Sequence, residues 1–431
     1  MLTKHFKAFP LCFFVEKINM SILRRLSTPE LWEAFYIKRT DNERMDRREA
    51  EDLRAFIDAR EYLPVIERIE AGIPFPFPHK KQINKMHSNK KRIIYTFDRA
   101  ENYVLKLLAQ QLHAYDGCFG KNLYSFRNDC GVRHAIADLT GVPGIDGMYA
   151  YKADIHDYFN SVDVSLLLPL LRQMLGEAER DLFEFLRELL ENEWVLWEEK
   201  AVREQKGIMA GVPVSSFLAN LYLADMDAFF AREGVPYARY SDDVLLFAPT
   251  RAQLEQRVRQ LHEYLAARHL RLNPEKEAYI EPGEPWNYLG FSYCRGVIDV
   301  SPVTIDKLKG KMKRKARALQ RWRLRKGASP EQAIRAYIRH FNRKFFANTA
   351  EHELTWCRWF FPVINTVTGL KEIDHYMQQC IRFLVSGKYT KANYNLRYET
   401  MRQLGYRSLV GAYYQKGGTN CKTVPREAKK E

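Results

Sequence analysis

Two short, mostly apolar runs in the middle of the chain flank a polar segment, and this pattern predicts a β-hairpin. Val235 to Tyr240 and Val244 to Ala248 are rich in β-branched and aromatic residues, which favour strands. The polar pair Asp242-Asp243 lies between the two runs, where a tight turn is expected. The hairpin is therefore predicted to present two adjacent carboxylates at its tip.

Similar patterns predict the elements around this hairpin. Met148 to Ile155 is interpreted as a strand that delivers Asp154 to its C-terminal end, where ligands usually lie in α/β sheets. The other predicted elements are a strand at Lys91–Tyr95, a helix at Arg99–Ala114, a helical stretch at Ser165–Trp197, a glycine-rich loop and helix at residues 207–223, and a helix at Ala252–His269. This order predicts an α+β fold of ferredoxin-like type, in which Asp154 and Asp242 can lie on neighbouring central strands.

The N-terminal region is predicted to be helical and then basic. Thr28-Pro29-Glu30 is typical of a helix start, with a capping hydroxyl, proline at the first helical position and an acidic first turn. A second, heavily charged helix is predicted at Arg47–Glu70. Gly72 to Arg92 is interrupted by prolines and contains six Lys or Arg and no acid. We interpret it as a loop that faces either solvent or phosphate.

The C-terminal region carries most of the excess positive charge. Lys307 to Pro330 contains eleven Lys or Arg and no acid, and it is predicted to be a basic amphipathic helix. Because so many charges of one sign require phosphates nearby, nucleic acid is the expected partner. Its candidate contact residues are Lys311, Lys313, Arg314, Lys315, Arg317 and Arg321. Phe341 to Tyr414 is predicted to be helical, and residues 417–431 are predicted to be disordered.

Composition narrows the class of protein. The 431 residues are 46% hydrophobic and 28% charged, which is typical of a soluble chain with two or three domains. The net charge of +15 favours nucleic acid over a membrane surface as the partner. The seven scattered cysteines form no CxxC pair, as expected for reduced thiols. The apolar run Phe9–Val15 is too short to span a membrane, so we expect a cytoplasmic protein with no membrane partner.

The paired acids are the first candidate for chemistry. Adjacent carboxylates repel each other and contribute nothing to a sheet, so Asp242 and Asp243 require either a counter-ion or full solvation. Mg²⁺ suits such a site because it prefers hard oxygen ligands and binds through one or two carboxylates together with substrate phosphates. A metal site and a solvated Asp-Asp turn are therefore the two interpretations of Tyr240–Asp243.

Six short blocks, in this order, resemble those of bacterial reverse transcriptases of the group II intron-like lineage. They are, in chain order, LYSFRNDCGVRHAI, KADIHDYFNSVD, GVPVSSFLANLYL, YSDD, LNPEKEAYI and WNYLGFSY. The resemblance covers roughly residues 85–295 and implies a right-hand polymerase with fingers, a ferredoxin-like palm and a helical thumb. The domains it implies are a helical N-terminal extension at 1–85, fingers and palm at 86–295, a basic helical thumb with a C-terminal extension at 296–416, and a tail at 417–431.

The resemblance implies a catalytic role for three acids. Asp154 and Asp242 would bridge two Mg²⁺ ions, for which Mn²⁺ is a possible substitute, and Asp243 would be their neighbour. In this family the ions activate the primer 3′-hydroxyl and stabilise the leaving pyrophosphate. The implied partners are an RNA template, an RNA–DNA duplex held by the basic helix, and dNTPs, and the oligomeric state is left open.

Other residues are implied to bind the incoming dNTP. Lys91, Arg92 and Arg127 would neutralise the triphosphate, since arginine suits bidentate contact with phosphate. Arg127 would equally suit a cap on a carbonyl inside the fold.

The nucleotide sugar and the leaving group also have implied contacts. Phe159 lies where the family has an aromatic ring that excludes a ribose 2′-hydroxyl, with core packing as the alternative. Gly211 permits close approach of the backbone to a ligand. Lys276 matches the family's candidate proton donor to pyrophosphate, or is an ordinary exposed lysine.

The chain departs from the family at Met209-Ala210-Gly211, where group II-like enzymes have Pro-Gln-Gly. The missing glutamine is implied to contact the nucleotide or the template base, so template dependence is in question. Three functions stay open: an RNA-templated DNA polymerase, a template-independent DNA polymerase of abortive-infection type, and an RNA-binding scaffold or maturase that retains the fold. Since a scaffold has no reason to keep three clustered acids, we favour a polymerase.

No motif of an HNH endonuclease, an RNase H or an integrase follows the basic helix. The chain therefore resembles the stand-alone, defence-associated (unknown group) reverse transcriptases, which are encoded beside a structured non-coding RNA. This resemblance implies antiphage defence, with that RNA as the template.

Overall fold

The computed structural model describes residues 20–40, 45, 47–84, 91–346 and 355–417. The chain divides into two compact units, residues 1–42 with 47–282, and residues 43–46 with 283–431. Trp286 to Cys294, which the sequence assigns to the palm domain, therefore belong to the second unit. The division into fingers, palm and thumb stays a prediction. Phe9–Val15, Cys421 and the tail predicted to be disordered (beyond residue 417) lie outside the described residues.

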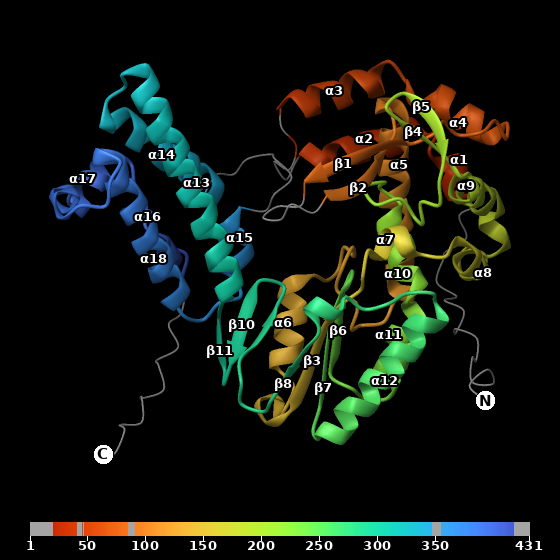
Figure 1. The fold of residues 1–431 in the computed structure, drawn as a ribbon. Helices are drawn as coiled ribbons and strands as arrows, with labels where there is room; N and C mark the ends of the chain where they lie inside the picture. Colours follow the sequence, from red (N-terminus) through yellow and green to blue (C-terminus); the bar gives the residue numbers. More distant parts are fainter. Residues whose placement is uncertain (1–19, 41–44, 46, 85–90, 347–354, 418–431) are drawn as a thin grey trace. The chain divides into compact units, whose positions relative to one another are not determined.

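A four-stranded antiparallel sheet with the order β6-β7-β3-β8 lies in the first unit (Figure 1). Its central strands are β3 (Tyr149–Asp154) and β7 (Asp243–Ala248), and its edges are β6 (Tyr237–Tyr240) and β8 (Ala278–Ile280). The predicted α+β fold and the predicted hairpin are confirmed. Residues far apart in sequence pair here because both central strands are almost fully buried, which drives two apolar runs together.

Helices surround this sheet, and α12 packs against β3 and β7. Its buried residues recur at Leu254, Val258, Leu261 and Leu265, the spacing of one helical face. The helices of this part of the unit are α5 (Arg99–Gln111), α6 (Val132–Thr140), α7 (Tyr158–Ser161), α8 (Val164–Leu175), α9 (Arg180–Glu191), α10 (Ser215–Tyr222), α11 (Ala224–Arg232) and α12 (Arg251–Ala267).

A second sheet, with the order β2-β1-β4-β5, corrects two predictions. The loop predicted at Gly72–Arg92 contains β1 (His79–Asn84), which pairs with β2 (Lys91–Thr96). The last proline of this segment is Pro78, so the backbone beyond it is free to pair although its sequence is polar. The helical stretch predicted to reach Trp197 ends at Glu191, and β4 (Trp194–Trp197) pairs with β5 (Lys200–Arg203).

The N-terminal helices are α1 (Ile22–Arg25), α2 (Pro29–Thr40), α3 (Arg47–Asp58) and α4 (Tyr62–Glu70). The predicted start at Pro29 is confirmed. The single helix predicted at Arg47–Glu70 is two helices, because Arg60 has a left-handed backbone (φ +52°) that ends α3. Trp32 holds them together, since its ring stacks on Tyr62 at 4.7 Å between centroids and is fully buried.

The second unit begins with an antiparallel sheet, β11-β10-β9, formed by β9 (Trp286–Tyr288), β10 (Phe291–Cys294) and β11 (Val297–Val300). It continues with α13 (Pro302–Lys326), α14 (Pro330–Phe346), α15 (Trp356–Phe360), α16 (Thr368–Ser386), α17 (Tyr398–Gln403) and α18 (Leu409–Gln415). The predicted basic helix is α13, which begins earlier than predicted because the Ser301 hydroxyl caps it. The helical prediction for Phe341–Tyr414 is confirmed in the described parts of that range, by the end of α14 and by α15 to α18, while residues 347–354 lie outside them.

Two further expectations concern single features of the chain. Within the described residues, no helix combines the length and apolarity that crossing a membrane requires. The described cysteines form no disulfide, and Cys12 and Cys421 lie outside the described part.

Candidate active site

The three acids lie at one end of the central strand pair. Asp154 is the last residue of β3, and its partner across the ladder is Asp243, the first residue of β7. Asp242 occupies the turn that precedes β7, and its carbonyl accepts a hydrogen bond from the Ile155 backbone at 2.9 Å. Asp154 is buried and the other two are half-buried. The fold thus brings Asp154 beside Asp242 and Asp243, which are distant from it in the sequence.

The turn that carries Asp242 has an uncommon backbone. Tyr240 pairs with Asp243, so Ser241 and Asp242 form a two-residue hairpin turn. Ser241 has φ +59°, and a positive φ at the first turn residue alone defines type II′, which favours glycine there. A serine in this conformation is strained, and strain of this kind persists only where neighbouring groups hold it.

A buried hydrogen-bond network holds the turn. The Ser241 backbone N–H donates to Ser125 Oγ at 2.9 Å, and that hydroxyl donates to Asn220 Oδ1 at 3.2 Å. The Asn220 amide in turn donates to the Ser125 carbonyl at 2.9 Å. Since Ser125 and Asn220 are almost fully buried, solvent does not compete for these bonds.

A buried ion pair supports the turn from the other side. Arg239 donates to both Asp227 oxygens, at 2.5 and 2.8 Å, and its guanidinium also donates to the Ser241 carbonyl at 3.3 Å. Both side chains of the pair are inaccessible to solvent. Burial disfavours the charged guanidinium, but the Asp227 carboxylate outweighs this and raises the pKa of Arg239. The pair is therefore charged and locks β6 in place.

The pKa values of Asp242 and Asp243 are raised above the ordinary value of an aspartate. Burial and then the charge of Asp154 raise the pKa of Asp242, while Lys276 and Arg92 oppose the rise. Burial and then the charge of Asp242 raise the pKa of Asp243 to about 6. Negative charge is therefore crowded at this end of the sheet, and a cation placed there would be bound favourably.

Lys276 supplies one positive charge to the cluster. Its ammonium group lies 2.6 Å from Asp154 Oδ1, and the lysine side chain is 54% exposed. The 3₁₀ helix Pro274–Lys276 is fixed beside β3 because the Asn273 backbone donates to the Asp154 carbonyl at 2.8 Å. The structure thus brings the predicted lysine onto a predicted catalytic acid.

The glycine-rich loop lies against β2, the strand that carries Lys91 and Arg92. The Tyr95 backbone donates to the Ala210 carbonyl at 2.8 Å, and a Cβ on Gly211 would lie 2.9 Å from the Tyr95 carbonyl oxygen. Gly211 has φ +103°, so both space and conformation require glycine there. The loop therefore fixes β2 beside its own backbone.

The same loop also fixes Phe159. The Ile208 backbone donates to the Phe159 carbonyl at 2.9 Å, and a Cβ on Gly207 would lie 2.3 Å from that oxygen. The half-buried Phe159 ring meets the exposed Phe126 ring edge-on, with 6.2 Å between centroids. Phe159 and β2 are thus held by one loop.

Arg127 is engaged by groups of its own loop. Its guanidinium donates to the Gly120 carbonyl at 2.9 Å and binds Asp129 through two bonds, at 2.6 and 3.0 Å. The side chain is 7% exposed. This arrangement matches the cap on a fold-internal carbonyl that the sequence left open.

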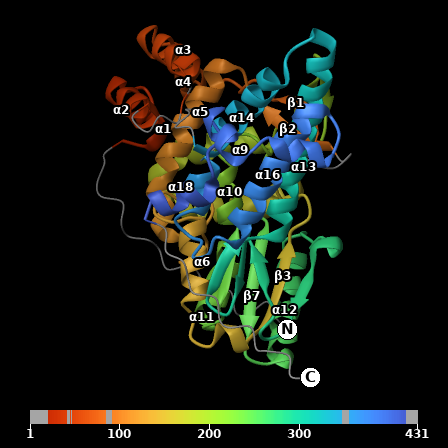
Figure 2. The ribbon, with the colours of Figure 1, turned by 90° about the vertical axis from the view of Figure 1, so that its left-hand side faces the viewer.

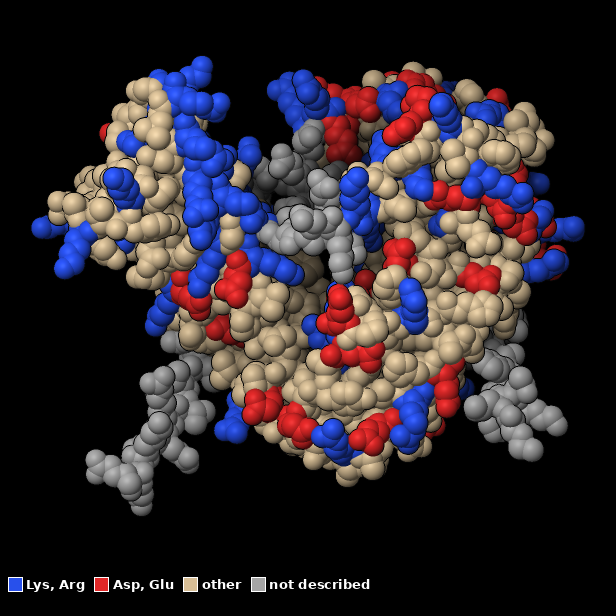
Figure 3. All heavy atoms as spheres, in the orientation of Figure 1, with Lys and Arg blue, Asp and Glu red and all other residues tan. Residues whose placement is uncertain are grey.

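The predicted nucleic-acid contacts all lie on α13, where Figure 3 shows a band of Lys and Arg. The buried side of the helix consists of Ile305, Leu308, Met312, Ala316 and Gln320. The basic residues occupy the other positions, with Lys313, Arg314, Arg317 and Arg321 exposed and Lys311 and Lys315 half-buried. The face that α13 turns to solvent is therefore strongly positive.

Comparison with known proteins identifies the family. Residues 79–293 match the reverse transcriptase (RNA-dependent DNA polymerase) family. This segment is a reverse transcriptase domain. The matched segment accordingly belongs to a family of RNA-directed DNA polymerases, and reverse transcriptases use divalent metal ions.

Solved structures that resemble the chain include two telomerases. Telomerase from Candida albicans, in complex with a TWJ fragment of telomeric RNA, is 13% identical, with a TM-score of 0.44, over 81% of this chain and 67% of that one. Apo telomerase from Candida tropicalis, truncated from its C-terminal domain, is 14% identical, with a TM-score of 0.40, over 53% and 56%. A search of curated proteins found no match.

The acids of the reverse transcriptase domain fit a substrate-assisted metal site. The described residues contain no ready cage of three or more His, Cys, Asp or Glu. Mg²⁺ rarely needs such a cage, because it keeps several waters and takes substrate phosphates as ligands. Burial, together with the charge of a neighbouring carboxylate, raises the pKa values of Asp242 and Asp243, and a divalent ion would offset both effects.

The residues that hold the turn were missed by sequence reasoning. Ser125 and Asn220 lie within recognised blocks but were not singled out, and Asp227 and Arg239 lie outside them. One signal was present, since Arg239 stands in an otherwise apolar strand and a buried arginine requires a carboxylate partner.

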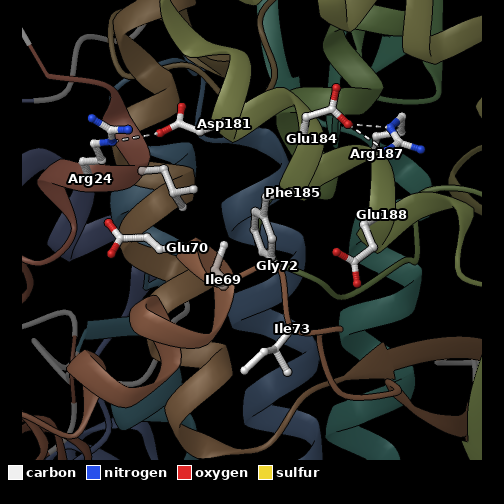
Figure 4. Close-up of a pocket in the computed structure, with 11 residues that line it drawn as sticks. Arg24, Ile69, Glu70, Gly72, Ile73, Asp181, Glu184, Phe185, Arg187 and Glu188 are labelled. Atoms are coloured by element: carbon white, nitrogen blue, oxygen red, sulfur yellow. Dashed lines mark hydrogen bonds and ion pairs between the residues drawn. The ribbon is translucent and has the colours of Figure 1, made fainter.

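A cavity of about 510 Å³ also lies in this unit, away from the acids (Figure 4). Its charged lining includes Glu70, Glu184 and Glu188, and its arginines face acids, as Arg24 does Asp181. Excess negative charge repels phosphate, so this cavity is not a nucleotide site.

Proposed function

We propose that this reverse transcriptase copies a partner RNA into DNA by metal-assisted phosphoryl transfer at Asp154, Asp242 and Asp243. The observation that carries the proposal is the pairing of Asp154 with Asp243 across β3 and β7, with Asp242 in the adjoining turn. In-line attack of a primer 3′-hydroxyl on the α-phosphorus of a dNTP forms a phosphodiester and releases pyrophosphate. Asp154 and Asp242 would hold the ions, with Asp243 as a neighbouring carboxylate.

The protein's own part in this reaction is positioning and charge. Two Mg²⁺ or Mn²⁺ ions, when bound, would activate the primer hydroxyl and neutralise the leaving pyrophosphate. The hydrogen-bonded turn at Ser241 would hold Asp242 in one position at the end of the strand pair. The carboxylate would then need little reorganisation during the reaction. Lys276, which neutralises Asp154 in the absence of metal, would be freed to donate a proton to pyrophosphate.

We assign the triphosphate to Lys91 and Arg92 on β2 and to the backbone of Gly211. The charge of Arg92 lowers the pKa of Asp242, which supports a position near the acids. Arg127 would stabilise its own loop rather than bind the triphosphate, since its guanidinium already donates hydrogen bonds to Gly120 and Asp129.

Magnesium binding is expected to weaken as the pH falls through about 6. The pKa of Asp243 is about 6, so below that pH a proton competes with the metal. In the metal-free protein, this folded-state pKa lies above the ordinary 3.8, so stability contributed by the protonated group is lost as the pH rises through about 6. Thermal unfolding at about pH 5 and about pH 8, with and without Mg²⁺, should show the larger metal-induced rise at pH 8.

Asp243→Asn tests the cause of that pH dependence, with Asp146→Asn as a matched control. The first variant should lose most of the difference between the two pH values, and the second should keep it. Equal metal-induced rises at both pH values in the unmodified protein would contradict the prediction.

Phe159→Ala is expected to admit ribonucleotides. Removing the ring makes room for a 2′-hydroxyl, so preference for dNTP over NTP should fall by about 10- to 100-fold. The measurement is single-nucleotide primer extension with each dNTP and its ribonucleotide. Phe126→Ala, which removes the neighbouring ring but keeps Phe159, is the control. If Phe159 only packs the core, both nucleotides will be used more slowly and their ratio will stay constant.

We propose a structured non-coding RNA as the template and antiphage defence as the biological role. The support is the resemblance to stand-alone defence-associated reverse transcriptases, together with the exposed basic face of α13, which suits a nucleic-acid backbone. Loss of phage protection in an Asp242→Ala strain would support the role, and unchanged protection would count against it.

The deciding experiment is sequencing of nucleic acid that co-purifies with the protein, before and after incubation with Mg²⁺ and dNTPs. An Asp242→Ala, Asp243→Ala variant is the control. DNA complementary to one bound RNA, absent from the control, would establish templated synthesis and identify the template. Bound RNA with no DNA product would contradict the polymerase proposal and favour a scaffold.

Low-complexity DNA that matches no RNA would instead identify template-independent synthesis. One observation favours this alternative: Ala210, which replaces the family's glutamine, is 3% exposed and offers no polar group to a template base. Ala210→Gln would therefore be the first substitution to test.

A further inference from the structure

Unit 2 presents two tyrosine rings to solvent on one short loop. Tyr389 is 67% exposed and Tyr394 is 60% exposed, although large aromatic rings are usually at least partly covered. The loop follows α16 and includes the 3₁₀ helix Lys391–Asn395. Residues 387–416 contain six Lys or Arg and one acid, Glu399. Two of these lysines, Lys388 and Lys391, are exposed on the same loop as the rings.

The loop that carries the rings is tied from within. Asn393 is 4% exposed, and its amide donates to the Lys388 carbonyl at 2.5 Å. Its side-chain oxygen accepts from the hydroxyls of Ser386 at 2.9 Å and Thr390 at 3.2 Å. A buried amide with three partners fixes the loop, so the two rings are held outward rather than left free to fold back.

Cations lie beside these rings. The Arg382 guanidinium lies over the Tyr394 ring, 4.8 Å from its centroid. The Tyr389 ring lies 5.2 Å from the Phe383 ring between centroids, so its inner edge packs on α16 while most of the ring is open to solvent. Lys309 lies 5.7 Å from the centroid of Tyr376 on α16. Aromatic rings and basic side chains thus lie close together on α13, on α16 and on the loop after α16. The two helices lie side by side (Figures 1 and 2).

This chemistry matches unpaired bases better than other partners. A duplex presents its phosphates but keeps its bases stacked on one another. Its phosphates would bind the basic side chains, and no base would be available to stack on the tyrosine rings. Unpaired bases stack on tyrosine and arginine planes, while their phosphates bind Lys and Arg. An apolar protein partner would use the rings but would leave the positive charge uncompensated.

We propose that Tyr389 and Tyr394, with Arg382, form a platform that binds the unpaired bases of an RNA strand. The choice of RNA rests on the proposed function, since a reverse transcriptase must hold an unpaired template before any DNA exists. The platform would grip RNA segments outside the duplex and thus select templates that combine paired and unpaired regions.

The test is equilibrium binding of the full-length protein to fluorescent oligonucleotides. The probes are an unstructured RNA, a blunt-ended RNA duplex and a DNA of the same unstructured sequence. Tyr389→Ala/Tyr394→Ala should weaken binding of the unstructured RNA by roughly 30-fold or more, since it removes the stacking of two bases. Duplex binding should change by less than about twofold, because its bases are already stacked.

Two control variants separate stacking from damage to the fold. Tyr389→Phe/Tyr394→Phe keeps both rings and should retain binding of the unstructured RNA. Tyr279→Ala removes another exposed tyrosine, in unit 1, whose neighbours include Glu277 and Glu255, and it should have no effect. Thermal unfolding of each variant shows whether the protein is intact.

Several outcomes would overturn the platform. One is unchanged binding of the unstructured RNA in the double alanine variant. Another is an equal loss of binding for the paired RNA duplex. The third is that the two tyrosines contribute more to binding of the DNA probe than to binding of the RNA probe. Unchanged RNA binding together with loss of a bound protein would reassign the face to a protein partner. Because binding requires no catalysis, the assay is independent of the proposed function, which fails separately if no DNA synthesis is found.

Discussion

Asp242→Asn is expected to abolish DNA synthesis while the protein stays folded. The substitution keeps the size of the side chain but removes one of the negative charges that would bind metal. Because a metal ion supplies several kcal/mol of charge stabilisation in the transition state, the rate should fall by roughly 10³-fold or more. Primer extension under single-turnover conditions measures this loss.

The same substitution should not destabilise the metal-free protein. Burial and the charge of Asp154 raise the pKa of Asp242, which means that the ionised carboxylate is unfavourable in the folded state at neutral pH. A neutral amide removes that cost, so the unfolding temperature in EDTA should be equal or higher. In Mg²⁺ the variant should show a smaller rise than the unmodified protein.

Asp146→Asn provides the matched control, because Asp146 is an exposed acid just before β3. It should retain both synthesis and the response to Mg²⁺. Synthesis by Asp242→Asn at more than about a tenth of the original rate would show that this carboxylate is not a metal ligand.

Asp227→Ala is expected to have the largest effect on stability. It leaves the Arg239 guanidinium buried without its carboxylate, and breaking a buried pair in this way costs about 3–5 kcal/mol. Urea unfolding at pH 7 measures the change. The control is Glu281→Ala, which breaks the exposed pair with Arg251 and should cost less than about 1 kcal/mol.

A double variant separates stability from positioning of the catalytic turn. Asp227→Leu with Arg239→Met replaces the pair by apolar groups, so most of the lost stability should return. The Ser241 carbonyl would still lack its guanidinium donor, and DNA synthesis should remain low. Full recovery of both stability and synthesis would show that the pair has no positioning role.

The sequence by itself determined the elements whose cause is local. Strand-forming runs on either side of Ser241 and Asp242, the acid at the end of β3 and the basic helix α13 were all evident from residue type and spacing. These predictions hold because propensity, periodicity and capping act over a few neighbouring residues. The family blocks then implied which acids carry the chemistry.

Only the tertiary structure decided features that depend on distant partners. The polar strand β1 exists because it pairs with β2, and Arg127 is engaged because Gly120 and Asp129 meet its guanidinium. Ser125 supports the catalytic turn across a separation of 116 residues. A hydroxyl or a guanidinium has the same appearance in a sequence whether it is solvated or buried against a partner, and its energetic role changes completely between the two. The placement of these polar groups is therefore a property of the fold rather than of any local pattern.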